Sequence, residues 1–126
     1  MNETLIQVGG FYNITLVVFH VLFWRIFDWK KDLQSLTILN RAIIQVLNIS
    51  LTIVFVVFAY ISFVHTEELL NSKLGFSIVI LMSLFWFARA FQQIVFFKLK
   101  HWVSWAFFAY FVLGGVIYAI PVIYNT

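Results

Sequence analysis

The chain has 126 residues, of which 63% are hydrophobic and only 10% are charged, and it contains no cysteine. A soluble globular domain is usually about 25% charged, so this chain has too few polar residues to cover a water-soluble particle. The composition excludes a soluble enzyme, a disordered chain and a nucleic-acid-binding domain of the usual kind. We therefore expect one integral membrane domain, over 1–126, that contacts the lipid bilayer.

Four stretches of the sequence are long and apolar enough to cross a bilayer as helices, which takes about 20 residues each. Their central parts carry no Asp, Glu, Lys or Arg, except that the third contains Arg89. Runs such as 53–58 are apolar at every position, which fits a lipid-facing helix and not the alternating strand of a membrane barrel. The predicted class is all-α, with helices at about 6–27, 41–64, 74–97 and 102–124.

The first predicted helix, 6–27, carries Asn13, His20 and Trp24 on one stripe. The segment that follows, 28–38, has apolar residues at helical spacing beside two lysines. Two interpretations of this segment stay open. It forms a short helix that lies in the membrane interface with its lysines at the headgroups, or it is a frayed extension of the first helix.

Polar side chains form one narrow stripe on each of the next two helices. In 41–64 they are spaced i, i+4, i+7 and i+11, which keeps them on one face of a helix. These residues are Arg41, Gln45, Asn48 and Thr52. In 74–97 the stripe consists of Trp86, Arg89 and Gln93. Polar groups inside a membrane tend to face a partner or a cavity, so these stripes are where a functional site is expected.

The fourth predicted helix, 102–124, differs from the others because it contains Gly114, Gly115 and Pro121. Gly115 and Ala119 have the small-xxx-small spacing that lets helices approach closely. We expect this helix to serve in contacts between helices, within the chain or between copies of it.

The positions of Lys and Arg predict the orientation in the membrane. Six of them flank the first and third connections, whereas the second connection holds only Lys73. The six are Arg25, Lys30, Lys31, Arg41, Lys98 and Lys100. Connections one and three are therefore expected on the cytoplasmic side. Short connections make successive helices antiparallel, which predicts an up-down four-helix bundle with both termini outside, most simply in the cell (inner) membrane.

The rise of a helix gives the depth of each polar residue below the predicted cytoplasmic surface. His20, Asn48 and Arg89 fall roughly 10–12 Å deep, and Gln45 and Gln93 roughly 6 Å deep. We therefore expect a polar layer within the cytoplasmic half of the bundle. The candidate ligand-binding residues are Arg89, His20, Asn48, Gln45, Gln93 and Arg41, the last at the mouth of the layer. Asn13 and Thr52 are almost the only polar residues expected in the outer half.

Cofactor and metal chemistry finds little support in the sequence. Haem held between helices needs two histidines at one depth, and His20, His65 and His101 lie at three different depths. Zinc needs about three or four nitrogen, oxygen or sulfur ligands together, which one histidine among amides does not supply. We expect no cofactor and no bound metal.

Arg89 is the residue that points to a function, because no Asp or Glu lies at its depth in any predicted helix. A buried cation without a counterion calls for an anionic partner. The preferred hypothesis is a small non-enzymatic membrane protein that binds an anionic lipid or small anionic ligand, for transport or as a subunit of a larger assembly or homo-oligomer. One alternative is a membrane-embedded enzyme acting on a lipid or quinone. Another is a purely structural accessory subunit, with the fourth predicted helix as its docking surface. The polar residues also have a structural interpretation, in which the amides only join helices and Arg89 extends toward the cytoplasmic headgroups.

Overall fold

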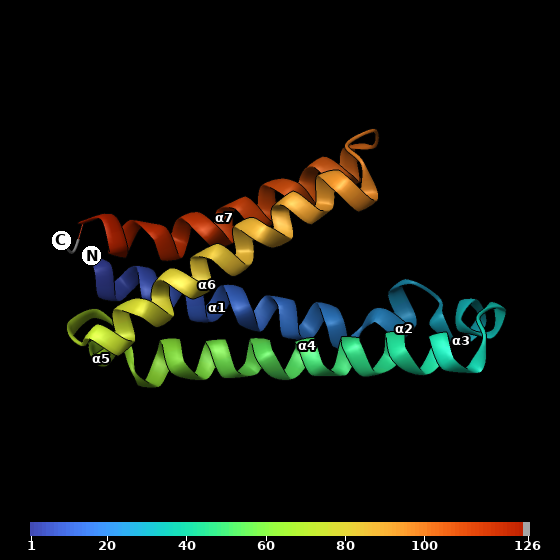
Figure 1. Ribbon diagram of the computed structural model, residues 1–126, viewed down its shortest axis with the longest axis horizontal. Helices are drawn as coiled ribbons and strands as arrows, with labels where there is room; N and C mark the ends of the chain where they lie inside the picture. Colours follow the sequence, from blue (N-terminus) through green and yellow to red (C-terminus); the bar gives the residue numbers. More distant parts are fainter. Residues whose placement is uncertain (125–126) are drawn as a thin grey trace.

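The computed structural model describes residues 1–124, which fold into helices joined by short connections (Figure 1). Within these residues there is no strand, so the predicted all-α class is confirmed. The elements are α1 (Asn2–Val21), α2 (Phe23–Ile26), α3 (Trp29–Asp32), the 3₁₀ turn η1 (Leu33–Ser35), α4 (Ile38–Val64), α5 (Thr66–Asn71), α6 (Lys73–Gln92), the π-helical turn η2 (Gln93–Phe97) and α7 (Trp102–Tyr124).

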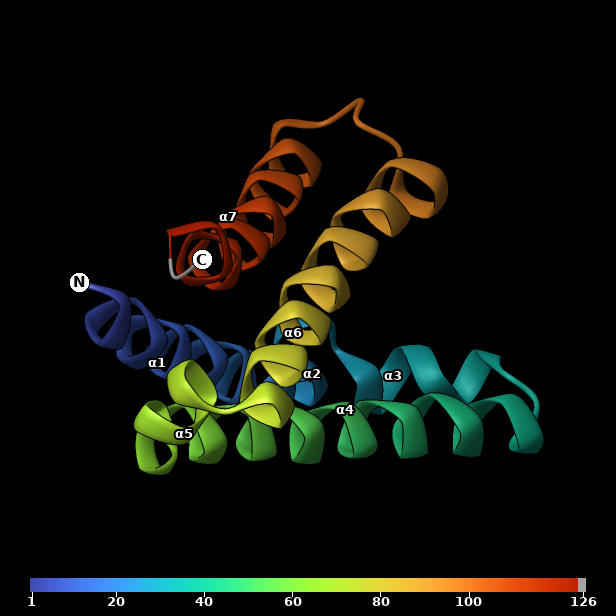
Figure 2. The same cartoon turned by 60° about the vertical axis from the view of Figure 1, so that its left-hand side comes forward.

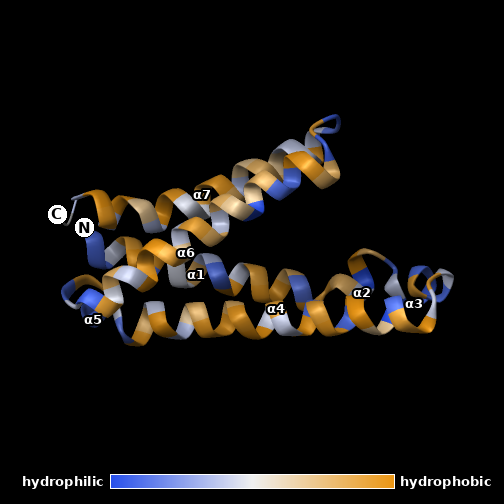
Figure 3. Cartoon of the chain, viewed as in Figure 1, coloured by the Kyte–Doolittle hydropathy of each residue, from blue (hydrophilic) through white to orange (hydrophobic). Residues whose placement is uncertain are grey.

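Four helical segments among the described residues have the length and composition of membrane spans. They are Asn2–Val21, Ile38–Val64, Lys73–Phe97 and Trp102–Tyr124. Hydrophobic residues dominate these helices, whereas hydrophilic residues gather at α5, around α2 and α3, and in the α6–α7 connection (Figure 3). The number of spans and their approximate positions were therefore predictable from composition.

The four long helices form two side-by-side pairs, α1 with α4 and α6 with α7 (Figures 1 and 2). The pairs meet near α5, the start of α1 and the end of α7. They diverge toward the opposite end, where α2, α3 and the α6–α7 connection lie. Because of this divergence, residues at the same level on the two pairs are not automatically neighbours.

The first helix and the connection after it differ most from expectation. The helix predicted at 6–27 begins at Asn2 and ends at Val21, and α2 follows as a separate single turn. Asp28 then adopts the left-handed conformation, with φ 50° and ψ 48°, which aspartate tolerates better than most residues. The segment 28–38 is consequently a pair of short turns, α3 and η1, and not one continuous helix.

Side-chain caps determine where the next two long helices begin. Thr37 accepts a hydrogen bond from the backbone N–H of Asn40 (3.3 Å), so α4 starts at Ile38 and not at the predicted residue 41. Ser72 accepts one from the backbone N–H of Gly75 (2.9 Å), which fixes the start of α6.

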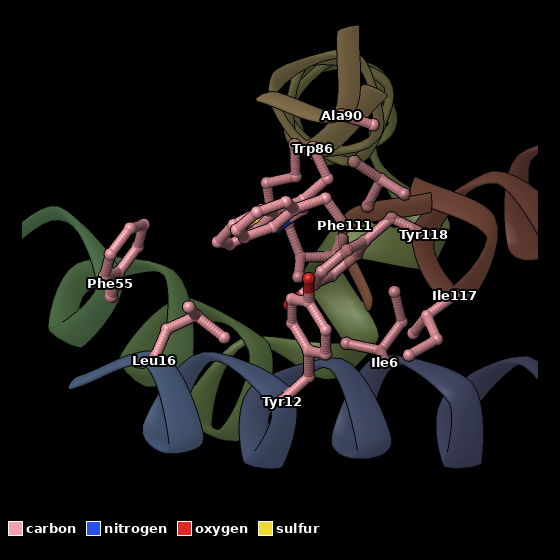
Figure 4. Close-up of a cluster of buried hydrophobic side chains, with 12 residues drawn as sticks. Ile6, Tyr12, Leu16, Phe55, Trp86, Ala90, Phe111, Ile117 and Tyr118 are labelled. Atoms are coloured by element: carbon pink, nitrogen blue, oxygen red, sulfur yellow. The ribbon is translucent and has the colours of Figure 1, made fainter. Parts of the chain in front are cut away.

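The core lies where the two helix pairs meet, around the indole of Trp86, which is 1% exposed (Figure 4). Tyr12 of α1 meets Trp86 edge-on at 5.0 Å between ring centroids, and Phe55 of α4 stacks on it at 5.3 Å. Phe111 of α7 completes the group at 6.0 Å, with its ring nearly parallel to the indole. These rings come from all four long helices, so the aromatic core holds the two pairs together.

Helices α1 and α7 approach each other through two reciprocal tyrosine–glycine contacts. A Cβ added at Gly9 would lie 2.5 Å from Cζ of Tyr118, and one added at Gly114 would lie 2.5 Å from Cζ of Tyr12. Any side chain larger than hydrogen at either position would therefore push the helices apart. The neighbouring Gly115 lies against the ring of Phe87 in α6, so the glycine pair of α7 serves contacts within the chain.

Candidate functional site

His20 and Asn48, two of the predicted layer residues, are brought together between α1 and α4. The amide of Asn48, a residue 5% exposed, donates a hydrogen bond to the backbone oxygen of His20 (3.0 Å). Nδ1 of His20 donates to the backbone oxygen of Leu16 (2.8 Å), because a carbonyl can only accept. Oδ1 of Asn48 is buried without a hydrogen-bond partner, so this residue retains an unused acceptor.

Gln45 and Arg41 lie further along α4, and their hydrogen bonds are local. Gln45 donates to the backbone oxygen of Arg41 (3.2 Å). The guanidinium of Arg41 donates to three backbone oxygens of the α3–η1 region, those of Leu33 (2.8 Å), Gln34 (3.4 Å) and Leu36 (3.2 Å). These bonds tie the connection to α4, which gives Arg41 a structural task besides any role at the mouth of a site.

Arg89 is half-buried on α6, and its guanidinium lies against aromatic rings. Cζ of Arg89 is 4.3 Å from the ring centroid of Phe111 and 5.6 Å from that of Phe97. One guanidinium nitrogen, Nη1, is buried and has no hydrogen-bond partner. Within residues 1–124 the one ion pair joins His65 and Glu68, so no carboxylate balances Arg89 there.

Gln93, one turn beyond Arg89, is 3% exposed and joins α6 to α7. Its amide donates to the hydroxyl of Ser104 (2.9 Å), which in turn donates to the backbone oxygen of Lys98. Gln93 thus closes the α6–α7 connection, which identifies a bonding partner, Ser104, that the helical stripes did not indicate.

The six candidate residues therefore fall into two groups, one on each helix pair. His20, Asn48, Gln45 and Arg41 belong to the α1–α4 pair, and Arg89 and Gln93 to the α6–α7 pair. No hydrogen bond joins the two groups within the described part of the chain. The two groups nevertheless lie near each other, because His20 and Arg89 are within electrostatic range. The structure therefore brings the candidate residues close without joining the two groups through a hydrogen bond.

A row of aromatic rings connects the two groups. The ring of His20 lies edge-on to Phe55 at 5.0 Å, and Phe55 stacks on Trp86. Trp86 stacks on Phe111, whose face carries the guanidinium of Arg89. Nε1 of Trp86 is buried without a hydrogen-bond partner, so a third unused polar atom lies in the same region as those of Asn48 and Arg89.

A second polar cluster, near the end of the molecule that holds the termini, was missed by the sequence reasoning. The amide of Asn13 donates to the hydroxyl of Tyr118 (2.9 Å) and to the backbone oxygen of Gly9 (2.8 Å). The hydroxyls of Tyr118 and Ser62 share a hydrogen bond of 2.7 Å. Asn13, Tyr118 and Ser62 are all fully buried, so this cluster holds buried polar groups in addition to Asn13 and Thr52, which were expected to be almost the only ones in the outer half.

The candidate residues supply positively charged and hydrogen-bonding groups. Within residues 1–124 no three His, Asp or Glu side chains are placed to hold a metal ion. The arrangement offers one cation, Arg89, together with hydrogen-bonding groups on the facing helix pair. Comparison of the chain with protein-family models, with curated proteins and with solved structures gives no match. The function therefore has to be argued from these residues themselves.

Proposed function

We propose that this is a small, non-enzymatic, multi-pass membrane protein that binds an anionic group at Arg89. The observation that carries the proposal is the buried Nη1 of Arg89, which has no hydrogen-bond partner. Removing a guanidinium from water costs several kcal/mol unless hydrogen bonds or a counterion replace the lost solvation. The rings of Phe111 and Phe97 compensate in part, since a cation–π contact contributes about 0.5–2 kcal/mol.

A group outside the chain supplies the rest of the interaction energy that the guanidinium loses when it leaves water. A lipid phosphate, a ligand carboxylate and an acidic residue of another subunit all provide the required chemistry. The indole N–H of Trp86, which has no hydrogen-bond partner, is a further donor that such an anion can engage. Gln93 then holds α7 beside α6 through Ser104, and Arg41 holds the connection at the mouth. His20 and Gln45 remain candidate hydrogen-bonding groups beside the site. The protein acts in transport or as a subunit of a homo-oligomer or larger membrane assembly.

The proposed membrane arrangement follows from the charged residues at the helix ends. The four spans pass up and down through a cell (inner) membrane, with both termini on the non-cytoplasmic side. The connections rich in Lys and Arg, from α1 to α4 and from α6 to α7, lie in the cytoplasm under the positive-inside rule.

The proposal is tested by purifying the protein in mild detergent and identifying bound lipids, small ligands and proteins by native mass spectrometry. The parent and Arg89→Lys should retain an anionic species or an acidic partner, whereas Arg89→Leu should lose it. If Arg89→Leu folds and carries the same bound species as the parent, Arg89 is not the binding residue.

A further inference from the structure

A second cavity, which we term the elbow groove, lies between the α2–α3 elbow and the first two turns of α4. Arg25, Lys30 and Arg41 line it together with the rings of Trp24 and Trp29, and its volume is about 720 Å³. It occupies the end of the α1–α4 pair, beside α2 and α3 (Figure 1). Its lining includes Arg41 and Gln45 of the first group but not Arg89. The groove is therefore a separate place for a ligand.

The charge of the elbow groove is predominantly positive. Three basic side chains line it against one acid, Asp28. No hydrogen bond or ion pair within residues 1–124 engages the side chains of Arg25 or Lys30. Arg41 is held in place by its bonds to backbone oxygens, so one of the three charges is already fixed before a ligand arrives.

The remaining wall of the groove contains two tryptophans and a leucine, together with the amides of Gln34 and Gln45. Trp24 and Trp29 meet edge-to-face at 5.0 Å between ring centroids, and both are half-buried. Leu33, which is 7% exposed, lies beneath them. A free inorganic anion would gain no free energy from contact with the tryptophan rings. A phospholipid would, because its phosphate can lie among the cations while its glycerol and upper acyl carbons contact the rings.

We propose that the elbow groove binds the phosphate headgroup of an anionic phospholipid, with Arg25, Lys30 and Arg41 around the phosphate and the two tryptophans against the lipid backbone. The groove lies where two candidate spans, α1 and α4, end. A lipid molecule beside these helices would therefore have its headgroup at this level, where Trp, Lys and Arg are the residues favoured by the interface.

The test titrates the full-length protein in detergent with phosphatidylglycerol or with phosphatidylcholine. The thermal midpoint of unfolding and the number of bound lipids are measured. Phosphatidylglycerol should raise the midpoint of the parent and phosphatidylcholine should not. Arg25→Gln combined with Lys30→Gln should weaken phosphatidylglycerol binding about thirtyfold, since each basic residue near an anionic lipid surface contributes roughly 1 kcal/mol. Lys30→Gln alone, an exposed single change, should show part of the same loss if the double variant does not fold.

The matched control is Lys98→Gln combined with Lys100→Gln, which removes the same charge from the α6–α7 connection outside the groove. This variant should bind phosphatidylglycerol as the parent does. Equal losses in the control and the groove variant would overturn the proposal in favour of general attraction to acidic lipid. Full binding by the groove variant would overturn it as well, and so would an equal stabilisation by inorganic phosphate at the same concentration.

Discussion

Arg89 is the residue that sets this molecule apart from a purely apolar bundle. It is the one charged residue between positions 74 and 97, yet its guanidinium is half-buried against Phe111 and Phe97. Burying a charge at this position lowers the stability of the fold, and charged residues inside a membrane usually have a functional role. Its presence was evident from the sequence, whereas its aromatic partners were not, because they depend on how α7 crosses α6.

Tyr118 is the second residue with consequences of its own. Its buried hydroxyl contacts Asn13 of α1 and Ser62 of α4, so it joins three helices. We predict that Tyr118→Phe lowers the free energy of unfolding by about 1–3 kcal/mol, because the buried groups of Asn13 and Ser62 lose their shared partner. Denaturant titration in detergent measures this change.

Tyr124→Phe is the control for that measurement, since Tyr124 lies on the same helix and is 72% exposed. It should change the free energy of unfolding by less than about 0.5 kcal/mol. If the two variants unfold alike, the hydroxyl of Tyr118 does not hold the helices together.

Among the elements, α1 and α7 pack through Gly9 and Gly114, each of which lies against a tyrosine ring of the other helix. We predict that Gly114→Ala destabilises the protein by about 1–3 kcal/mol, because the added Cβ overlaps the ring of Tyr12. Leu113→Ala, at a neighbouring exposed position, is the control and should have a small effect. Thermal unfolding of the two variants and the parent provides the comparison.

A double-mutant cycle tells steric overlap apart from an effect on α7 alone. In the background of Tyr12→Ala the ring that meets residue 114 is gone, so Gly114→Ala should cost much less. An unchanged cost in that background would mean that the glycine matters for a reason other than contact with α1.

The elements themselves could be predicted to different degrees. The run of apolar residues gave the span 102–124 almost as observed, and Thr37 and Ser72 are caps that a search for Ser and Thr before an apolar run would find. The break at Leu22 could not be found in the same way, because apolar residues continue through 22 and 23. The left-handed conformation of Asp28 could not be found either, because hydropathy carries no information about backbone dihedral angles.

On the scale of the whole molecule, the divergence of the two helix pairs decides what the candidate site can be. Depth along each helix placed His20, Asn48 and Arg89 at one level, and this is computable from sequence. Whether they touch depends on the angle between the pairs, which is determined by contacts between distant residues such as Phe55, Trp86 and Phe111. The His20–Asn48 contact lies within one pair and could be expected. That Arg89 lies within electrostatic range of His20 without a hydrogen bond between the two groups could not.

The proposed topology leads to a labelling prediction that uses the lack of cysteine in the chain. Single cysteines at Ser35→Cys and His101→Cys should react with an impermeant maleimide only from the cytoplasmic side. Asn71→Cys should react only from the opposite side, because α5 lies at the other end of the spans (Figure 1). All three positions are exposed. Labelling of Asn71→Cys and Ser35→Cys from the same side would contradict a four-span arrangement.

The most direct test of whether Arg89 lacks a hydrogen-bonding or charged partner within the chain is a comparison of thermal midpoints. Arg89→Leu and the parent are measured in detergent stripped of lipid. Lys100→Leu is the control for loss of an exposed charge. We predict a higher midpoint for Arg89→Leu, because a buried cation without a counterion costs more than its aromatic contacts return. Adding back the anion that co-purifies with the parent should stabilise the parent alone. A parent that is the more stable protein in stripped detergent would contradict the account, since its guanidinium would then be satisfied within the chain.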